Sequence, residues 1–228
     1  RLVCPCSKHK TFHEVIPHLK ESVDFSYDQL MSALGFMGND YRKFIEIFNK
    51  QLNVVYKIDT EKTYFDCTNF FFEIDCEDHF RRKGPSKENR KDPIIGMGLL
   101  LDANQIPIGM KLYPGNENEK PILRDVIRDL KNRHHIDGKT IHVADKGLNC
   151  AQNIAFSKEN GDGYLFSKSV KSLPETEKTW VLLDNDDWHE VRDKNGNLLY
   201  QCKSCIDRFP YVIEVDNKKK TLYFTEKR

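Results

Sequence analysis

Residues 62–74 read Lys62-Thr-Tyr-Phe-Asp-Cys-Thr-Asn-Phe-Phe-Phe-Glu-Ile74. Aromatic and β-branched residues dominate this stretch, as they do in buried β-strands. We therefore expect a strand here, with Phe70 to Phe72 in the protein core. An isolated Asp near a strand end usually stabilises a turn or caps a helix. A functional role can therefore be assigned to Asp66 only from the elements around it.

The following residues alternate between strand and helix patterns. Apolar runs predict strands, and Ile122, Leu123, Val126, Ile127 and Leu130 repeat at helical spacing. In chain order we expect strands at 93–101 and 106–113, a helix at 119–133, a strand at 140–144, a helix at 149–159 and a strand at 163–167. With the first strand, this gives the order β-β-β-α-β-α-β of a mixed sheet in an α/β (α+β) domain, which is the order of the RNase H-like fold.

The flanking segments have other patterns. Apolar residues between positions 27 and 52 indicate two short amphipathic helices around Gly35 to Asn39. From residue 168 onward, short alternating runs such as 180–183 and 198–202 suggest a β-rich insertion. We therefore divide the chain into an N-terminal, partly helical segment (1–60), the first part of an RNase H-like catalytic domain (61–167) and an incomplete β-rich insertion (168–228).

Composition sets wide limits on function. The chain has 228 residues, 39% of them hydrophobic, and 36 Lys and Arg nearly balance 35 Asp and Glu. Bulk charge therefore neither demands nor excludes a nucleic-acid partner. No apolar run is long enough for a membrane span, no secretory signal is recognisable, and the seven cysteines form an odd set. We expect free thiols, no membrane partner and a cytoplasmic location.

Two aspartates stand out once the strand order is considered. Asp66 lies in the first predicted strand, and Asp145 ends the fourth. In the RNase H-like fold these two strands are central neighbours, so the carboxylates should converge. Their mutual repulsion is relieved by a divalent cation, and hard oxygen ligands suit Mg²⁺ or Mn²⁺. Two such ions can activate a nucleophile and stabilise the leaving oxygen of a phosphodiester.

Five sequence blocks resemble one known family. In chain order the blocks are Tyr64-Phe-Asp-Cys-Thr-Asn-Phe-Phe-Phe-Glu73, Phe80-Arg-Arg-Lys-Gly-Pro-Ser-Lys87, Gly98-Leu-Leu-Leu-Asp102, Tyr113-Pro-Gly-Asn-Glu-Asn-Glu119 and Val143-Ala-Asp-Lys-Gly-Leu148. They resemble the successive blocks of bacterial insertion-sequence DDE transposases of the "insertion sequence four" superfamily. The Asp-x-Thr and Ala-Asp-x-Gly blocks, with the Gly-Asn-x-x-Glu block between them, carry most of this resemblance.

The resemblance implies a function and a site. It implies that Asp66 and Asp145 are the first two catalytic, metal-binding carboxylates of a DNA transposase. Such an enzyme is a polynucleotidyl transferase that acts in DNA recombination of mobile elements. Mg²⁺ or Mn²⁺ would be the cofactor, with two ions in the complete site. The enzyme would cleave double-stranded DNA at element ends and join it to target DNA, as a possible homodimer associated with the bacterial nucleoid. The family's third carboxylate, in a Tyr-x-x-Arg-x-x-x-Glu pattern, is expected beyond Arg228, so the chain alone should be inactive.

The densest basic stretch is the candidate DNA contact. Residues 81–91 hold six Lys or Arg and one Glu. Such side chains can bind backbone phosphates beside the site without reading sequence. The candidate residues are Arg81, Arg82, Lys83, Lys87, Arg90 and Lys91.

Other interpretations stay open. A truncated, non-catalytic transposase remnant that binds DNA or a partner is the main alternative, and an RNase H-like nuclease with a different third ligand is another. The acidic run from Glu73 to Asp78 suggests a solvated loop. Cys4, Cys6, His9 and His13, or Cys202 and Cys205, are weak zinc candidates because neither set has a complete ligand pattern. His134, His135 and His142 are interpreted as helix-end and strand residues.

Overall fold

The computed structural model describes residues 4–86, 89, 91–133, 136, 138–184 and 188–204, and the backbone of 210–215 and 218–223. The chain forms two compact units, Arg1–Lys57 and Ile58–Arg228. The domain boundaries near residues 60 and 167 stay predictions.

The first unit is helical. It contains α1 (Lys8–Lys10), a π-helical turn (Thr11–Val15), a 3-10 turn (Ile16–His18), α2 (Tyr27–Asn39) and α3 (Tyr41–Val55). Ser26 and Gln29 form a capping box that starts α2. The two predicted helices are present, but α2 runs through Gly35 to Asn39 and the break between the helices lies at Asp40, one residue after the predicted segment. Glycine within a helix costs only about 1 kcal/mol, so the capped helix can continue through Gly35.

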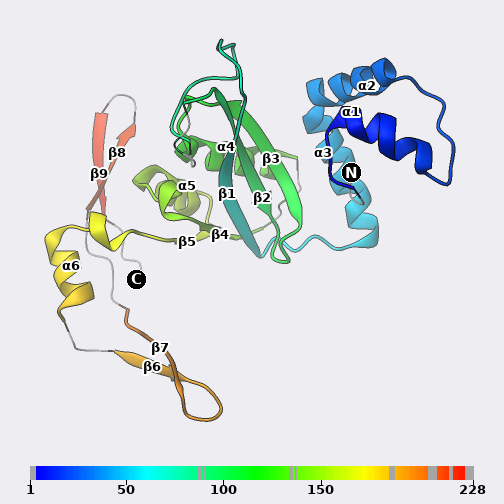
Figure 1. Cartoon of the computed structure of the whole chain (residues 1–228). Coiled ribbons are helices and arrows are strands. Elements are labelled where there is room, and N and C mark those ends of the chain that lie inside the picture. Colours follow the sequence, from blue (N-terminus) through cyan, green and yellow to red (C-terminus); the bar gives the residue numbers. More distant parts are fainter. Residues whose placement is uncertain are drawn as a thin grey trace. The chain divides into compact units, whose positions relative to one another are not determined.

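The second unit is built on a five-stranded mixed sheet (Figure 1). Its strands are β1 (Lys62–Phe71), β2 (Ile94–Leu101), β3 (Pro107–Pro114), β4 (Ile141–Ala144) and β5 (Gly163–Phe166). They lie in the order β3-β2-β1-β4-β5, with β1 antiparallel to β2 and parallel to β4. The predicted α/β fold class and the β-β-β-α-β-α-β order are confirmed.

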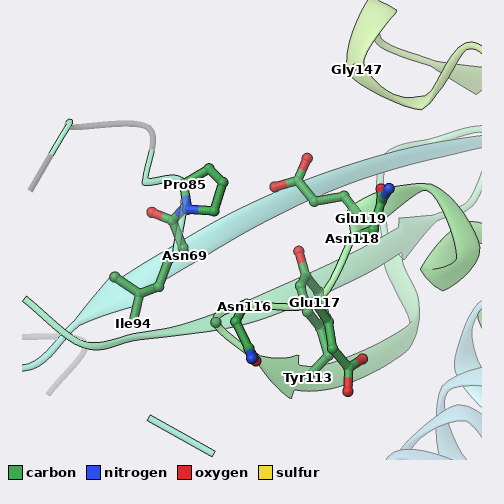
Figure 2. Close-up of a pocket in the computed structure, with 11 residues that line it drawn as sticks. Asn69, Pro85, Ile94, Tyr113, Asn116, Glu117, Asn118, Glu119 and Gly147 are labelled. Carbon is green, nitrogen blue, oxygen red and sulfur yellow. The ribbon is translucent and has the colours of Figure 1, made fainter. Parts of the chain in front are cut away.

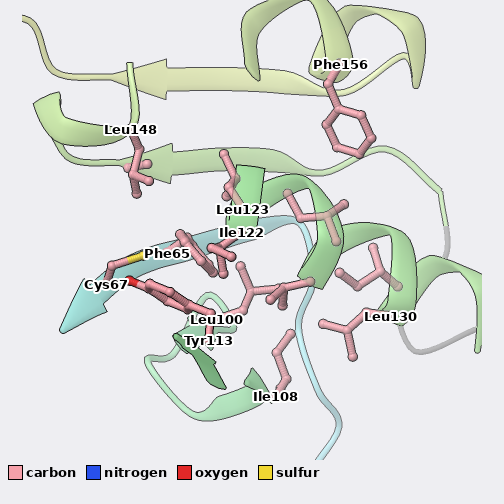
Figure 3. Packing of buried hydrophobic residues seen from close by; sticks show 14 residues of the cluster. Phe65, Cys67, Leu100, Ile108, Tyr113, Ile122, Leu123, Leu130, Leu148 and Phe156 are labelled. Atoms are coloured by element: carbon pink, nitrogen blue, oxygen red, sulfur yellow. The ribbon is translucent and has the colours of Figure 1, made fainter. Parts of the chain in front are cut away.

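Two helices cover one face of this sheet. They are α4 (Glu119–Asn132) and α5 (Ala151–Glu159), joined by an Arg124–Asn153 hydrogen bond. The apolar side of α4 packs on alternate residues of the strands, with Phe65 and Leu100 among them (Figure 3). Close packing needs glycine in β2, because a Cβ on Gly96 would overlap the Tyr113 ring.

The opposite face of the sheet carries exposed apolar side chains. Exposed fractions are 50% for Phe70, 40% for Ile141 and 65% for Leu165. The expectation that Phe70 and Phe71 belong to the core is therefore wrong in this structure, since Phe71 is also 39% exposed. Composition identified the strand correctly. Whether a face of the sheet is buried depends on helices from distant parts of the sequence, which local composition does not indicate.

The part after β5 contains a 3-10 turn (Val170–Ser172), helix α6 (Glu175–Leu182) and two hairpins. The hairpins are β6 (His189–Arg192) with β7 (Leu198–Cys202), and β8 (Pro210–Val215) with β9 (Lys218–Tyr223). The strand predicted at 180–183 is wrong. Acidic residues in the first turn favour the helix, and Glu177 is buried beside Lys168 with a 3.1 Å ion pair. Among the described residues, no helix is long and apolar enough to cross a membrane.

Candidate active site

Asp66 and Asp145 occupy matching positions on neighbouring strands. Phe65 and Ala144 form the last aligned pair of the parallel strands β1 and β4, and the two aspartates are the residues that directly follow them. Asp145 keeps an extended backbone, with φ −70° and ψ 166°. Neighbouring strands lie about 4.8 Å apart. The register of the sheet thus places the two residues at the ends of adjacent strands, and the convergence of their carboxylates stays a prediction.

Both carboxylates point away from the helix-covered face. Phe65 and Ala144 are buried in the cluster that α4 covers. Because successive strand side chains alternate between faces, Asp66 and Asp145 lie on the other face, where both residues are exposed. The burial pattern thus presents two carboxylates to solvent on a rigid strand pair.

Hydrogen bonds orient these two side chains. Asp66 accepts from the Cys67 backbone N–H at 2.8 Å, and Asp145 accepts from the Lys146 backbone N–H. Asp145 also accepts from the Ser167 hydroxyl at 3.2 Å. Ser167 directly follows β5, and its carbonyl oxygen accepts from Asn149. Sequence reasoning missed Ser167, because only the pairing of β4 with β5 brings it to Asp145.

The donor set fits a hydrated divalent cation in part. Two adjacent carboxylates supply hard oxygen ligands, which suit Mg²⁺ or Mn²⁺ with water in the remaining positions. Among the described residues, no group of three or more His, Cys, Asp or Glu side chains is placed to hold a metal ion. Metal binding by Asp66 and Asp145 stays a prediction.

The acidic residue Asp78 stabilises the turn that precedes the predicted basic loop. Asp78 accepts from the backbone N–H groups of Phe80 and Arg81 and pairs with the Arg81 guanidinium. These interactions, with the two backbone hydrogen bonds foremost, lower the pKa of Asp78 to about 2. The acidic run lies in an exposed loop, as predicted, and Asp78 in addition organises the turn before the basic residues.

The predicted DNA-contact residues differ in how their side chains are held. The Arg81 side chain is held by Asp78, whereas Arg82 and Lys83 form no side-chain bond to a described residue. The Arg82 backbone pairs with Ile94 at the start of β2, so the loop is anchored to the sheet. Lys91 is exposed, and the candidates Lys87 and Arg90 lie outside the described residues. DNA contact stays a prediction for all six.

A pocket of about 380 Å³ opens beside the same end of the sheet (Figure 2). Its floor includes Tyr113, whose burial, above all, raises its pKa, with the Cys67 thiol and the carboxylates of Glu119 and Asp66 adding to the effect. Amide and carboxylate side chains from the loop before α4 line the rim. The Gly-Asn-x-x-Glu block marks this loop in the sequence, but the sequence did not indicate that the loop lines a pocket.

The other candidate ligands are partly described. The His9 and His13 rings lie 4.3 Å apart in the first unit. Cys205 and the pair His134 and His135 lie outside the described residues. His142 is buried in β4, as a strand residue, and contacts Thr63 and Asp162.

Comparisons with known proteins were made for the whole chain. No protein-family model matches it, and no curated protein sequence shows significant similarity to it. Two transposases are among the solved structures it matches. One is the Mos1 transposase paired-end complex with left transposon end, at 13% identity and a TM-score of 0.33, covering 53% of this chain and 39% of that one. The other is the piggyBac transposase synaptic complex with hairpin DNA, at 15% identity and a TM-score of 0.47, covering 88% and 48%. The chain thus spans half or less of either transposase chain.

Proposed function

We propose that this chain carries the first two metal-binding carboxylates, Asp66 and Asp145, of a DNA transposase that cleaves DNA and transfers strands. The observation that carries the proposal is their side-by-side position after Phe65 and Ala144, exposed on one face of the sheet. Ordered sequence blocks that resemble the "insertion sequence four" superfamily, a DDE family of bacterial mobile elements, support the same assignment.

The chemistry follows from two carboxylates on rigid strands. Asp66 and Asp145 would hold Mg²⁺ or Mn²⁺, and such ions, when bound, activate a water or 3′-hydroxyl and stabilise the leaving oxygen of a phosphodiester. The protein's own contribution is positioning. β1 and β4 fix the two ligands relative to each other, and the Ser167 hydroxyl orients Asp145. Arg82 and Lys83 on the anchored loop would bind backbone phosphates of double-stranded DNA.

The first test is metal binding by the chain itself. Mn²⁺ titration followed by electron paramagnetic resonance should give affinity that falls about tenfold or more in Asp66→Asn and in Asp145→Asn, since each loses one charged ligand and tenfold is about 1.4 kcal/mol. Asp75→Asn, in the exposed loop after β1, is the matched control and should bind like the wild type. Unchanged Mn²⁺ affinity in both site variants would refute the proposal.

The second test is DNA cleavage by the full-length protein. Metal-dependent nicking of DNA that carries the element's ends should be abolished by Asp66→Asn. Cleavage at the wild-type rate in that variant would show that the chemistry lies elsewhere. Salt-sensitive DNA binding without cleavage by any form of the protein would instead favour the non-catalytic alternative.

A further inference from the structure

A chain of buried polar side chains connects β1, β4 and the turn before β5. The Thr63 hydroxyl lies 2.8 Å from Nδ1 of His142, and Nε2 of His142 lies 3.0 Å from the Asp162 carboxylate. All three side chains are fully buried. Lys131, from α4, donates to both carboxylate oxygens of Asp162, at 2.8 and 2.6 Å. The buried negative charge of this chain is therefore balanced.

The direction of each hydrogen bond follows from its partners. A carboxylate can only accept, so Nε2 of His142 carries a proton and donates it to Asp162. Burial, above all, lowers the pKa of His142, which keeps the ring neutral at neutral pH, and its Nδ1 atom accepts from the Thr63 hydroxyl. Hydrolases activate a nucleophilic hydroxyl with the same three kinds of group. Thr63 and His142 have an exposed fraction of 0%, so no substrate can reach this hydroxyl.

The two hydrogen-bonded residues share their strands with the proposed metal ligands. Thr63 and His142 are an aligned pair of the parallel strands β1 and β4. Asp66 follows Thr63 by 66 − 63 = 3 positions, and Asp145 follows His142 by 145 − 142 = 3 positions. The side chains of the two pairs lie on opposite faces of the sheet, so the pairs are connected through the strand backbones and not through side-chain contacts.

The register of β1 and β4 decides whether the two carboxylates can share an ion. A slip of β4 by two residues would keep the faces of all its side chains but would place Asp145 beside Thr68, about 7 Å further along β1 than Asp66. Two oxygens on one Mg²⁺ ion lie at most about 4 Å apart. The apolar residues Ile141 and Val143 would keep their face in this slipped register, so they do not exclude it.

The buried histidine distinguishes the native register from a slipped one. A slip of two residues in one direction would place His142 beside the core residue Phe65, and Nδ1 would lose its donor. A slip in the other direction would place it beside Glu61, whose carboxylate accepts and cannot replace the hydroxyl donor of Thr63. Asp162 holds the other ring nitrogen, so the ring cannot turn away. Burying an unpaired polar group is unfavourable, which disfavours both slips.

We infer that the Thr63–His142 hydrogen bond fixes the register of β1 and β4 and thereby the positions of Asp66 and Asp145 relative to each other. Thr63 and His142 are thus positioning residues for the proposed metal site. The inference rests on the proposed function and adds to it two residues that contact neither metal nor DNA. Single buried polar groups fix the register of paired helices in the same way.

The first measurement is Mn²⁺ affinity, followed by electron paramagnetic resonance. Thr63→Val keeps the shape of the side chain and removes its hydroxyl, and its Mn²⁺ affinity should fall about fivefold, which is about 1 kcal/mol. Thr63→Ser keeps the hydroxyl and should restore most of the affinity. Ile108→Val is the control, because it removes a buried methyl group from β3, two strands away from β1. It should lower stability and leave Mn²⁺ affinity unchanged.

The second measurement reports the register without any metal. Nuclear Overhauser effects between the backbones of Tyr64 and Val143 are expected in the wild type, because these residues are an aligned pair. They should persist in Thr63→Ser and in Ile108→Val. In Thr63→Val they should weaken, and a second set of signals should connect Val143 with Asp66, the partner that a slip of two residues gives it.

A double variant keeps the inference testable if Thr63→Val does not fold. Thr63→Val combined with His142→Leu replaces both partners of the hydrogen bond by apolar side chains, which leaves no buried polar group unpaired and costs little stability. The register would then lose its polar determinant although the core is filled. This double variant should fold, show the second set of signals and bind Mn²⁺ about fivefold more weakly than the wild type, which again is about 1 kcal/mol.

The outcomes separate this inference from its premise. The inference requires both a slipped register and weaker Mn²⁺ binding in a folded variant without the hydrogen bond, and the absence of either change overturns it. If Asp66→Asn and Asp145→Asn left Mn²⁺ affinity unchanged, the proposed function itself would fail. Weaker binding in those two variants, together with wild-type binding in folded Thr63→Val, would remove the positioning role alone.

Discussion

The Ser167 hydroxyl donates a 3.2 Å hydrogen bond to the Asp145 carboxylate. This contact joins the end of β5 to the residue that follows β4, and it leaves the Asp145 carboxylate with two donors, Ser167 and the Lys146 backbone N–H. A hydrogen bond to an ionised group is worth about 1.5–3 kcal/mol when buried, and less when both groups are exposed, as they are here. Ser167 is thus a positioning residue for the proposed metal ligand.

Ser167→Ala should weaken Mn²⁺ binding about threefold, which is about 0.7 kcal/mol, because the Asp145 carboxylate becomes freer to rotate. Ser167→Thr, which retains the hydroxyl, should restore most of the affinity. Ser169→Ala removes a nearby hydroxyl that forms no side-chain cap and serves as the control. Equal Mn²⁺ affinity in the wild type and in Ser167→Ala would remove Ser167 from the site.

Replacing both Arg82 and Lys83 with Ala should weaken DNA binding and its dependence on salt. For each phosphate that the variant no longer binds, the slope of log affinity against log salt should fall by about one. Anisotropy titrations across a range of salt concentrations would measure both quantities. Lys194→Ala, in the turn between β6 and β7, removes one surface charge far along the chain and should leave the slope within error. A double variant with the wild-type slope would exclude this loop as a phosphate-binding element.

The positions of Asp66 and Asp145 at the ends of adjacent strands were predictable from sequence, because the order of strands and helices indicates which strands are neighbours. Asp66 and Asp145 are 145 − 66 = 79 positions apart, and the β-β-β-α-β-α-β pattern alone places their strands together. Ser167 and Tyr113 were not predictable, because their roles depend on strand register and side-chain direction. A slip of one residue would turn either side chain to the other face.

The errors in the sequence predictions have a common cause. Local composition favoured a core position for Phe70 and a strand around Trp180. The burial of Phe70 and the secondary structure at Trp180 depend instead on residues elsewhere in the chain. Glu177 illustrates this: burial beside Lys168 ties α6 to the segment after β5, and no local pattern encodes that ion pair.

Gly96→Ala should destabilise the second unit by about 1–3 kcal/mol. Its methyl group would overlap the Tyr113 ring, and overpacking a tight core carries a cost of this size. Urea denaturation followed by circular dichroism would measure the change. Gly147→Ala is the matched control, since the nearest atom to its Cβ is 4.0 Å away, and its free energy of unfolding should change little. Wild-type stability in Gly96→Ala would mean that Tyr113 can move at no cost.

His142 should make the free energy of unfolding depend on pH. Its side chain is fully buried between Thr63, 2.8 Å from Nδ1, and Asp162, 3.0 Å from Nε2. Burial, the largest effect, lowers its pKa below 6.5, although Asp162 opposes this shift. The unfolded chain therefore binds a proton more readily than the folded chain. Stability is fully present above pH 6.5 and declines as the pH falls towards the lower, folded-state pKa, by at most about 1.4 kcal/mol per pH unit.

Urea denaturation between pH 5 and pH 8, followed by tryptophan fluorescence, would reveal this dependence. Both tryptophans, Trp180 and Trp188, lie in the second unit. His142→Gln should lower stability at every pH but flatten the pH profile below 6.5, whereas His189→Gln, at an exposed position in β6, should keep the wild-type slope. The slope separates the titration of His142 from a general loss of packing, because a packing defect shifts the whole profile without changing its shape. An unchanged slope in His142→Gln would assign the pH dependence to other groups.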